Sequence, residues 1–242
     1  MHVYRLFKAG LLMLGLLSTD AMAGISLDSS RVIFSASNLA QGQSIGITSS
    51  PQSPSPYLIR AQVLGDVTGT QTQTLFSVTP SLFRLEPGST NQLRIVKSGN
   101  QALVQNKESV FYLRVIALPA GQGSKPEKET ELGGVITVST GSIIKMFYRP
   151  SGLSMTQQQA MSALQFAKQG SELLLSNPGP YFVTLKSLSI AGKSVPISAH
   201  QQNTMIAPFS DMRYSNTILQ GKVTWQAIND HGVTETFHGA IR

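Results

Sequence analysis

Residues 135–150, VITVSTGSIIKMFYRP, combine an alternating β-strand pattern with a lysine set among apolar side chains, and they carry the strongest signal for the class of fold. Ile136, Val138 and Thr140 fall on one face of an extended strand, because successive side chains point to opposite sides. A strand of this kind is built to be paired with another strand. The stretch predicts a β-sheet protein in which this face is a candidate contact surface for a partner chain.

Lys145 lies at the far end of the same strand pattern. Its neighbours are almost all apolar: Ile143, Ile144, Met146, Phe147 and Tyr148. An unpaired charge in such a setting is costly, so Lys145 indicates an anionic partner. The alternative is that Lys145 extends its ammonium group to solvent from the rim of a sandwich.

Short strand patterns broken by turn residues continue through the whole first half of the chain. Seven candidate strands cover residues 25–34, 44–48, 57–64, 75–78, 92–96, 110–118 and 134–147. Pro51, Pro54 and Pro56 punctuate one gap, and residues 86–89 (EPGS) form a strong tight-turn signal. The count and spacing are typical of an immunoglobulin-like sandwich, and the charged loop 121–132 is expected to be mobile.

A domain boundary is expected at residues 148–152 (YRPSG), where the strand pattern stops at a proline followed by a glycine. The second module offers strands at 163–167, 172–176, 182–190, 193–197, 203–207, 222–228 and 235–241, and residues 156–167 are open to a short helix instead. Residues 229–232 (NDHG) suit a hairpin turn, and Trp225 is expected in the core. The prediction is an all-β protein with a leader at 1–23 and domains at 24–149 and 150–242.

The first 23 residues have the pattern of a Sec-type secretory signal peptide. Arg5 and Lys8 precede the apolar run 11–17, and residues 21–23 (AMA) supply a small-x-small cleavage pattern, so cleavage is predicted after Ala23. The apolar run is far below the roughly 20 residues that span a bilayer, and no later stretch is long enough either. Export without membrane insertion is therefore expected, and a membrane anchor is the competing interpretation.

Composition narrows the function classes. There is no cysteine, so the fold depends on neither disulfides nor thiolate-bound zinc. Removing the leader takes one net positive charge from the formal +7 and leaves +6 on the mature chain. These cations are scattered singly rather than clustered with stacking aromatic residues, which argues against nucleic acid as a partner.

No constellation of catalytic residues is visible in the sequence. The four histidines (His2, His200, His231 and His238) have no metal-ligand spacing, and neither a nucleophile elbow nor a phosphate-binding glycine loop is present. Asp211 and Asp230 occupy turn-like contexts in which turn formation is the commoner use. The sequence thus indicates a binding protein, with no catalytic residue, metal or cofactor expected.

Seven motifs, in order, resemble the periplasmic pilus chaperones of the chaperone/usher pathway, the PapD-like family. They occupy residues 27–34 (LDSSRVIF), 83–88 (FRLEPG), 108–113 (ESVFYL), 144–150 (IKMFYRP), 177–182 (NPGPYF), 205–209 (MIAPF) and 228–232 (INDHG). They span nearly the whole mature chain. Each motif alone is weak, whereas seven in the same order are highly specific.

The resemblance implies two immunoglobulin-like domains in an L or boomerang arrangement, with a cleft that holds the end of an unfinished pilin subunit. Arg31 and Lys145 match the family's pair of cations that grip the subunit's C-terminal carboxylate. Ile136, Val138 and Thr140 match the strand that fills the subunit's groove. The resemblance further implies pilin subunits and an outer-membrane usher as partners, a periplasmic location and a non-enzymatic role.

One feature of the donor strand sets this chain apart within the resemblance. Thr140 and Ser142 stand where bulkier aliphatic residues are common, which predicts a shallow subunit pocket or a weaker hold. Self-capping by a homodimer is a further hypothesis, because an exposed apolar edge strand is an aggregation hazard.

The rival interpretations are a secreted pilus subunit, an adhesive or carbohydrate-binding module, and a secreted hydrolase on a sandwich scaffold. A strand pattern that begins at Ile25 argues against a subunit, whose donor extension would come first.

Overall fold

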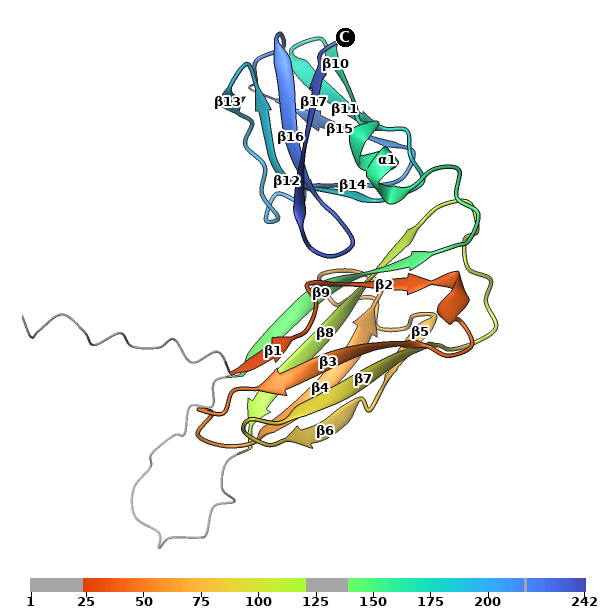
Figure 1. The fold of residues 1–242 in the computed structure, drawn as a ribbon, viewed down its shortest axis with the longest axis vertical. Coiled ribbons are helices and arrows are strands. Elements are labelled where there is room, and N and C mark those ends of the chain that lie inside the picture. The colour runs from red at the N-terminus through yellow and green to blue at the C-terminus, as the bar shows by residue number, and fades with distance from the viewer. Residues whose placement is uncertain (1–23, 121–138, 216) are drawn as a thin grey trace, which may run out of the picture.

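The computed structural model describes residues 24–120, 139–215 and 217–242. Two β-sandwich domains follow each other along the molecule, and their strands run in different directions (Figure 1). The expected signal peptide, the loop 121–132, and the positions Ile136 and Val138 lie outside the described residues. No helix in the described part of the chain is long and apolar enough to cross a membrane.

The N-terminal domain is a sandwich of two sheets. Its elements are β1 (Ile25–Leu27), β2 (Arg31–Ser35), a 3-10 turn at Ala36–Asn38, β3 (Gln43–Ser49), β4 (Tyr57–Leu64), β5 (Phe76–Thr79), β6 (Leu82–Leu85), β7 (Thr90–Lys97), β8 (Ser109–Pro119) and β9 (Thr140–Arg149). One sheet has the order β1-β3-β7-β5 and the other the order β2-β9-β8-β4-β6. The predicted all-β sandwich is confirmed.

The first predicted strand, 25–34, is wrong in one respect, because the chain changes sheets within it. β1 pairs antiparallel with β3, whereas β2 crosses to the other sheet and pairs parallel with β9. Asp28 supports the crossing, since its carboxylate accepts a hydrogen bond from the Gly46 amide at 2.8 Å. Ser29 also donates to the Arg31 carbonyl at 2.7 Å. These hydrogen bonds satisfy backbone groups that would otherwise lack a partner where the strand pairing is interrupted.

The interior of this sandwich is apolar and aromatic. Phe34 and Ile47 come from opposite sheets and are fully buried, and Phe34 packs edge to face on Phe76 with ring centres 4.9 Å apart. Met146 and Tyr148 bring β9 into the same core. Burial of such side chains contributes roughly 1.5–3 kcal/mol each, which fixes the inward face of β9.

The C-terminal domain is a second, smaller sandwich. Its elements are α1 (Gln157–Ser162), β10 (Gln165–Gln169), β11 (Glu172–Asn177), β12 (Val183–Ile190), β13 (Lys193–Ser194), β14 (Met205–Ile206), β15 (Ser210–Tyr214), β16 (Lys222–Ile228) and β17 (Thr234–Ala240). The sheets have the orders β10-β11-β15 and β13-β12-β16-β17, with β14 added beside β12. Trp225 is buried as predicted and lies 5.0 Å from the ring centre of Phe166.

Local sequence patterns explain where these elements begin and end. The open choice at 156–167 is resolved as a helix followed by a strand, because Thr156 and Gln159 form a reciprocal capping box at the start of α1. The hairpin turn predicted at 229–232 is confirmed between β16 and β17. The strand predicted at 193–197 is shorter than expected, and Asp211 lies in β15 rather than in a turn.

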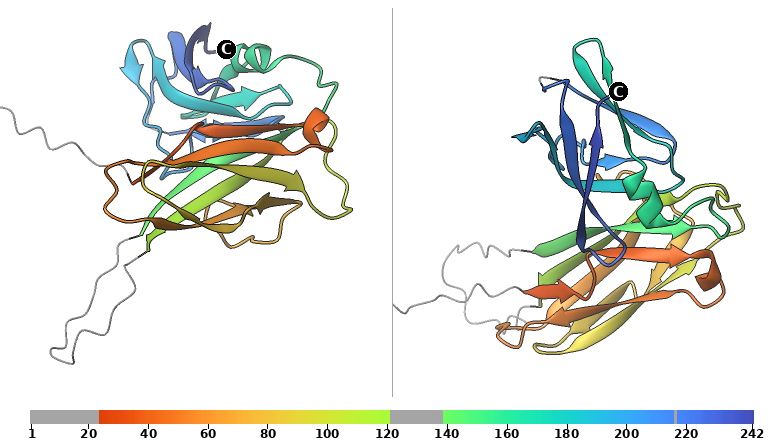
Figure 2. Two further views of the ribbon diagram at one scale, coloured as in Figure 1. Left: turned by 60° about the horizontal axis from the view of Figure 1, so that its bottom comes forward. Right: turned by 45° about the horizontal axis from the view of Figure 1, so that its top comes forward.

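The two domains meet where the β16–β17 hairpin of the C-terminal domain reaches β2 and β9 of the N-terminal domain (Figures 1 and 2). Their backbones are joined directly, since the Glu108 amide donates to the Pro180 carbonyl at 2.9 Å. Phe147 and Phe182 pack across the junction with ring centres 5.7 Å apart. This junction positions the charged groups described next.

Candidate functional site

Among the described residues, no strand pairs with one edge of β9 along half of its length. β9 pairs with β8 from Thr140 to Tyr148, but it pairs with β2 only from Lys145 to Arg149. Within the described residues, positions 140–144 therefore have no strand on the β2 side. A row of unpaired backbone N–H and C=O groups is a template for another strand.

The face of β9 that carries Thr140 is the face that continues the sandwich core. The register with β8 is unbroken and places Thr140 opposite Ala117 and Ile144 opposite Leu113. Ala117 and Leu113 are buried, whereas Thr140 itself is exposed. Thr140 thus lies where the inward face of β9 reaches solvent, and Ile136 and Val138 precede it in the segment that is not described.

Arg31 lies at the point where β2 joins this edge. It is the register partner of Lys145 on the neighbouring strand, and Arg31 is only 9% exposed. Its guanidinium Nη1 donates to the Ile228 carbonyl of the C-terminal domain at 3.1 Å, while its Nε is buried without a hydrogen-bond partner in the described part of the chain. Burial lowers the pKa of Arg31, but an arginine still stays charged.

Lys145 is half-buried beside Arg31, on the outward face of the sheet. Its Nζ donates to the Thr184 hydroxyl of the C-terminal domain at 3.4 Å. Burial, and then the charge of Arg31, lower the pKa of Lys145 to about 8. The structure therefore brings the two predicted anchor residues together, with no carboxylate among the ion pairs of the described residues to neutralise them.

A cavity of about 210 Å³ opens beside the Lys145 side chain between the two domains. Its lining combines Val67, Tyr112 and Lys145 of the N-terminal domain with Ala199, Gln202, Thr204 and Met205 of the C-terminal domain. Polar hydroxyl and amide groups and apolar side chains face the same space. The cleft expected between the domains is thus present next to Lys145.

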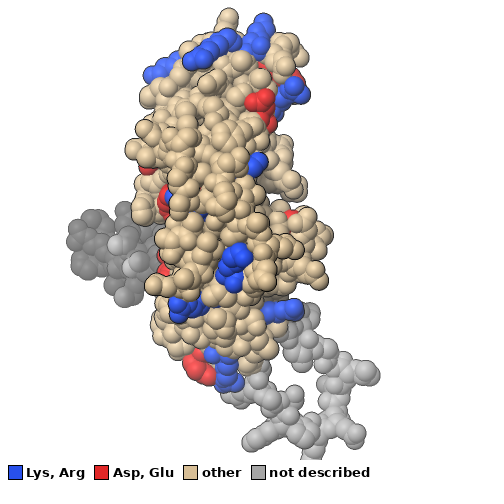
Figure 3. All heavy atoms as spheres, turned by 90° about the vertical axis from the view of Figure 1, so that its right-hand side faces the viewer, with Lys and Arg blue, Asp and Glu red and all other residues tan. Residues whose placement is uncertain are grey.

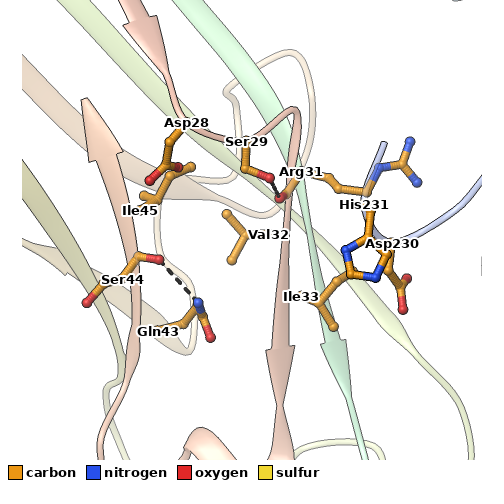
Figure 4. Close-up of a pocket in the computed structure, with 10 residues that line it drawn as sticks. All are labelled: Asp28, Ser29, Arg31, Val32, Ile33, Gln43, Ser44, Ile45, Asp230 and His231. Atoms are coloured by element: carbon orange, nitrogen blue, oxygen red, sulfur yellow. Dashed lines mark hydrogen bonds between the residues drawn. The ribbon is translucent and has the colours of Figure 1, made fainter. Parts of the chain in front are cut away.

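A second cavity, of about 340 Å³, lies on the Arg31 side of the junction (Figure 4). Arg31 leaves β2 toward the loop that carries Asp230 and His231, and Asp28, Gln43 and Ser44 lie on the opposite wall. Asp230 is close enough to raise the pKa of Arg31 against the effect of burial. Arg31 is thereby held between the C-terminal hairpin and its own sandwich.

A third cation of the junction, Arg149, has a different environment. Its guanidinium donates to Glu108 at 2.8 Å and makes a two-pronged contact with Asp230 at 2.6 and 2.7 Å. It also lies 4.9 Å from the ring centre of Tyr181. Burial opposes the shift, but the hydrogen bond to Asp230 and the charge of Glu108 raise the pKa of Arg149. This cluster ties β9 of one domain to the hairpin of the other.

Sequence reasoning missed part of this arrangement. Asp230 does lie in the predicted turn, yet it also binds Arg149, and Glu108 accepts from Arg149 and from the Phe182 amide at 2.9 Å. The available signal was the placement of Glu108 and Arg149 next to apolar strand patterns, where a charge needs a partner. No pattern pointed to Thr184.

The fold and junction define a two-domain protein of immunoglobulin-like sandwiches with a binding site at their junction. The chain matches the family described as "Pili and flagellar-assembly chaperone, PapD N-terminal domain" over residues 24–154. It matches "Pili assembly chaperone PapD, C-terminal domain" over residues 159–238. The chain therefore belongs to the PapD-like family of pilus chaperones, whose role in folding and assembly is non-enzymatic.

Individual relatives carry the same description. The chain is 34% identical over 212 residues to the "Probable fimbrial chaperone protein ElfD" of Escherichia coli K12, which covers 86% of this chain and 83% of that protein. It is 32% identical over 213 residues to "Chaperone protein FimC" of the same strain, with 88% and 82% covered. The chain is thus a fimbrial chaperone of the chaperone/usher pathway.

Solved structures agree with this assignment. The chaperone SafB of Salmonella enterica, crystallised with the pilin SafA, matches with a TM-score of 0.72 at 26% identity, over 89% of this chain and 95% of that one. The "Periplasmic Chaperone SfaE" matches with a TM-score of 0.71 at 29% identity, over 90% and 100%. The rival interpretations as a pilus subunit, an adhesive module or a hydrolase are not supported.

Proposed function

We propose that this protein is a periplasmic chaperone that binds pilin subunits by donor-strand complementation, caps them and delivers them to an outer-membrane usher. One observation supports this function above the others. The unpaired edge of β9 ends at Arg31 and Lys145, two cations that share a register position and lack a carboxylate partner in the described structure. A strand edge that ends at two neighbouring cations suits an added strand whose last residue carries the C-terminal carboxylate.

The geometry also supports one direction for the bound strand. β2 occupies the edge of β9 from Lys145 onward and runs parallel to it. A subunit strand that occupies the preceding positions 140–144 meets the start of β2 and stops there. Its C-terminal carboxylate reaches Arg31 and Lys145 only if the strand runs parallel to β9. The cations would thereby fix the register of the added strand.

The groove-filling part of the function belongs to the inward face of β9. Ile136, Val138 and Thr140 alternate on one face in the sequence, and Thr140 begins the described part of that face. We expect the aliphatic members to enter the groove of an incomplete subunit, with roughly 1.5–3 kcal/mol for each side chain that becomes fully buried. Thr140 would contribute less, because its hydroxyl group is costly to bury without a partner.

The N-terminal sequence supports a periplasmic location. The pattern of Arg5, Lys8, the apolar run 11–17 and the AMA motif before Gly24 predicts export and cleavage after Ala23. Mass spectrometry of the mature protein from a periplasmic extract is expected to give an N-terminus at Gly24. Retention of residues 1–23 would contradict this part of the proposal.

The decisive test is recovery of subunits by variants of the anchor. Lys145→Ala is expected to leave a folded protein that no longer retains pilin subunits in a pull-down from periplasmic extract, with bound chains identified by mass spectrometry. Removing one member of a buried charge contact typically costs about 2–5 kcal/mol, or roughly 30-fold or more in affinity. Lys222→Ala, an exposed cation at the far end of the C-terminal domain, is the matched control. Normal recovery with Lys145→Ala would contradict the anchor.

The same edge supports a proposal about the free chaperone. A strand edge that awaits a subunit is an aggregation hazard unless it is covered, so we expect two free chaperones to cap each other's β9 edge as a homodimer. Sedimentation at increasing protein concentration, with and without bound subunit, tests this. A monomer at every concentration would exclude self-capping.

A further inference from the structure

The far end of the C-terminal domain carries a group of cations that the subunit site does not use. We call it the basic end, and it consists of Lys168 on β10, Lys193 on β13, Arg213 on β15, Lys222 on β16, and Arg242 after β17. All five residues are exposed. None of them takes part in the three ion pairs within the described residues. Lys and Arg side chains gather at this upper end of the molecule in Figure 3.

The strand topology places these residues at one end of the domain. The Lys168 amide donates to the Arg242 carbonyl at 3.2 Å, and the Ala191 amide, two residues before Lys193, donates to the Lys222 carbonyl at 2.9 Å. The opposite ends of the same strands lead to the domain junction. β16, for example, begins at Lys222 and ends at Ile228, whose carbonyl binds Arg31.

Acidic residues of this domain are distributed in the opposite way. Asp230 and Glu235 lie beside the junction hairpin, and Asp211 pairs in register with Ser176, one residue before the junction-facing Asn177. Only Glu172, at the β10–β11 turn, lies at the basic end, and it accepts a hydrogen bond from the Ser215 hydroxyl at 2.6 Å. The domain is therefore electrically polarised along its length, with its positive end away from the cleft.

The form of the basic end indicates what kind of anion it fits. Its cations are exposed and come from five separate elements, so they do not form an enclosed pocket for one small anion. The large aromatic residues nearest in sequence, Phe166, Tyr214 and Trp225, are buried in the core and unavailable for stacking on bases. The exposed large apolar side chains of the C-terminal domain within the described residues are Phe209, just before β15, and Val233, in the β16–β17 hairpin that reaches the junction, and neither is at the basic end. An extended anionic surface, approached without insertion, fits these features.

We propose that the basic end adsorbs to bilayers that contain anionic phospholipids, with the lipid phosphates as the groups recognised. Each Lys or Arg near such a surface adds to the attraction, and salt screens it within about 10 Å at 0.1 M ionic strength. A chaperone resting on this end holds its cleft and its N-terminal domain away from the lipid. Adsorption would concentrate the protein at a membrane while leaving the subunit site open.

Vesicle co-sedimentation with the full mature chain tests the proposal. At low salt, the wild type is expected to sediment with phosphatidylcholine vesicles that contain about a third phosphatidylglycerol, and to stay in solution with pure phosphatidylcholine and at 0.5 M salt. The triple variant Lys168→Glu, Lys193→Glu, Lys222→Glu is expected to lose at least about tenfold in partition to the anionic vesicles. Circular dichroism and unchanged subunit recovery establish that this variant is folded.

A control with the same net charge separates the basic end from general electrostatics. Arg60→Glu, Arg84→Glu, Arg94→Glu removes three exposed cations of the N-terminal domain and is expected to keep most of the vesicle binding. Equal loss in both triple variants would overturn the proposal, as would no binding of the wild type to anionic vesicles. Retention on immobilised polyglutamate through the same three lysines, without vesicle binding, would assign the basic end to an acidic protein and also overturn it.

Discussion

The cations at the domain junction differ in whether they contact carboxylates. Arg149 is held by Glu108 and Asp230 at hydrogen-bond distance, and these contacts raise its pKa. Arg31 and Lys145 lie side by side, and within the described residues their side chains hydrogen-bond only to a carbonyl and a hydroxyl, while the pKa of both is lowered. A cation held by two carboxylates joins the domains, whereas a cation pair that forms no ion pair within the described residues is suited to an anion from outside.

The difference has an energetic meaning for the free protein. Burying a charge without a counter-ion costs stability, and the fold retains that cost at Lys145. Local strain or unpaired charge of this sort is commonly found at functional sites rather than elsewhere. Removal of the Arg149 charge is therefore expected to lower the stability of the fold, and removal of the Lys145 charge is expected to raise it.

The largest expected effect on stability comes from replacing Arg149, the cation that contacts carboxylates. Arg149→Ala removes the cation that forms ion pairs with both Glu108, whose side chain is 2% exposed, and Asp230. Breaking a buried pair in this way costs about 3–5 kcal/mol, so the urea midpoint of unfolding is expected to fall sharply. Trp225 fluorescence and far-ultraviolet circular dichroism report on the unfolding.

Arg84→Ala is the matched control for this prediction. Arg84 also forms an ion pair, with Glu86 at 2.6 Å, but the two side chains are 61% and 57% exposed. An exposed pair contributes about 0–1 kcal/mol, so its loss is expected to be nearly silent. Similar midpoints for the two variants would refute the distinction between the junction and the surface.

The second effect has the opposite sign. Lys145→Met keeps the apolar stem and removes the charge, so it is expected to raise the free energy of unfolding at pH 7 by about 1–3 kcal/mol. The pKa of Lys145 is about 8 in the folded chain against an ordinary 10.5, so the protonated form penalises the folded state below about pH 8. The advantage of the variant shrinks as the pH rises from about 8 to 10.5. Equal gains in urea titrations at pH 7 and pH 10 would contradict this origin.

The smallest effect is the pH dependence of subunit binding. A carboxylate binds the protonated Lys145, so affinity is expected to be highest below about pH 8 and to fall above it, by at most about tenfold for each pH unit. Isothermal titration with a peptide that has the last strand of a recovered subunit measures this. The same peptide with an amidated C-terminus is the control and is expected to bind weakly at every pH. A wild-type affinity that does not change from pH 7 to pH 9.5 would exclude Lys145 as the anchor.

Much of the fold could be predicted because it rests on local patterns. Alternating side chains in residues 57–64 and 110–118 gave β4 and β8, and the NDHG turn gave the β16–β17 hairpin. The errors have tertiary causes. The sheet change at Asp28 and the strands β6 and β15 depend on pairing with distant strands, which no local window records.

The candidate site, like the fold, has features that the sequence predicts and others that depend on tertiary packing. The alternating pattern of residues 135–150 and the apolar neighbours of Lys145 can be read from the sequence alone, because side-chain spacing and hydrophobicity are properties of the chain, and residues 140–149 of this stretch form β9. Which cation forms ion pairs depends on the packing of strands and domains that are distant in the sequence. Parallel pairing of β2 with β9 brings Arg31 to Lys145, and the hairpin brings Asp230 to Arg149 instead. Charges act over a few ångströms in space, so their partners are set by packing and not by distance along the chain.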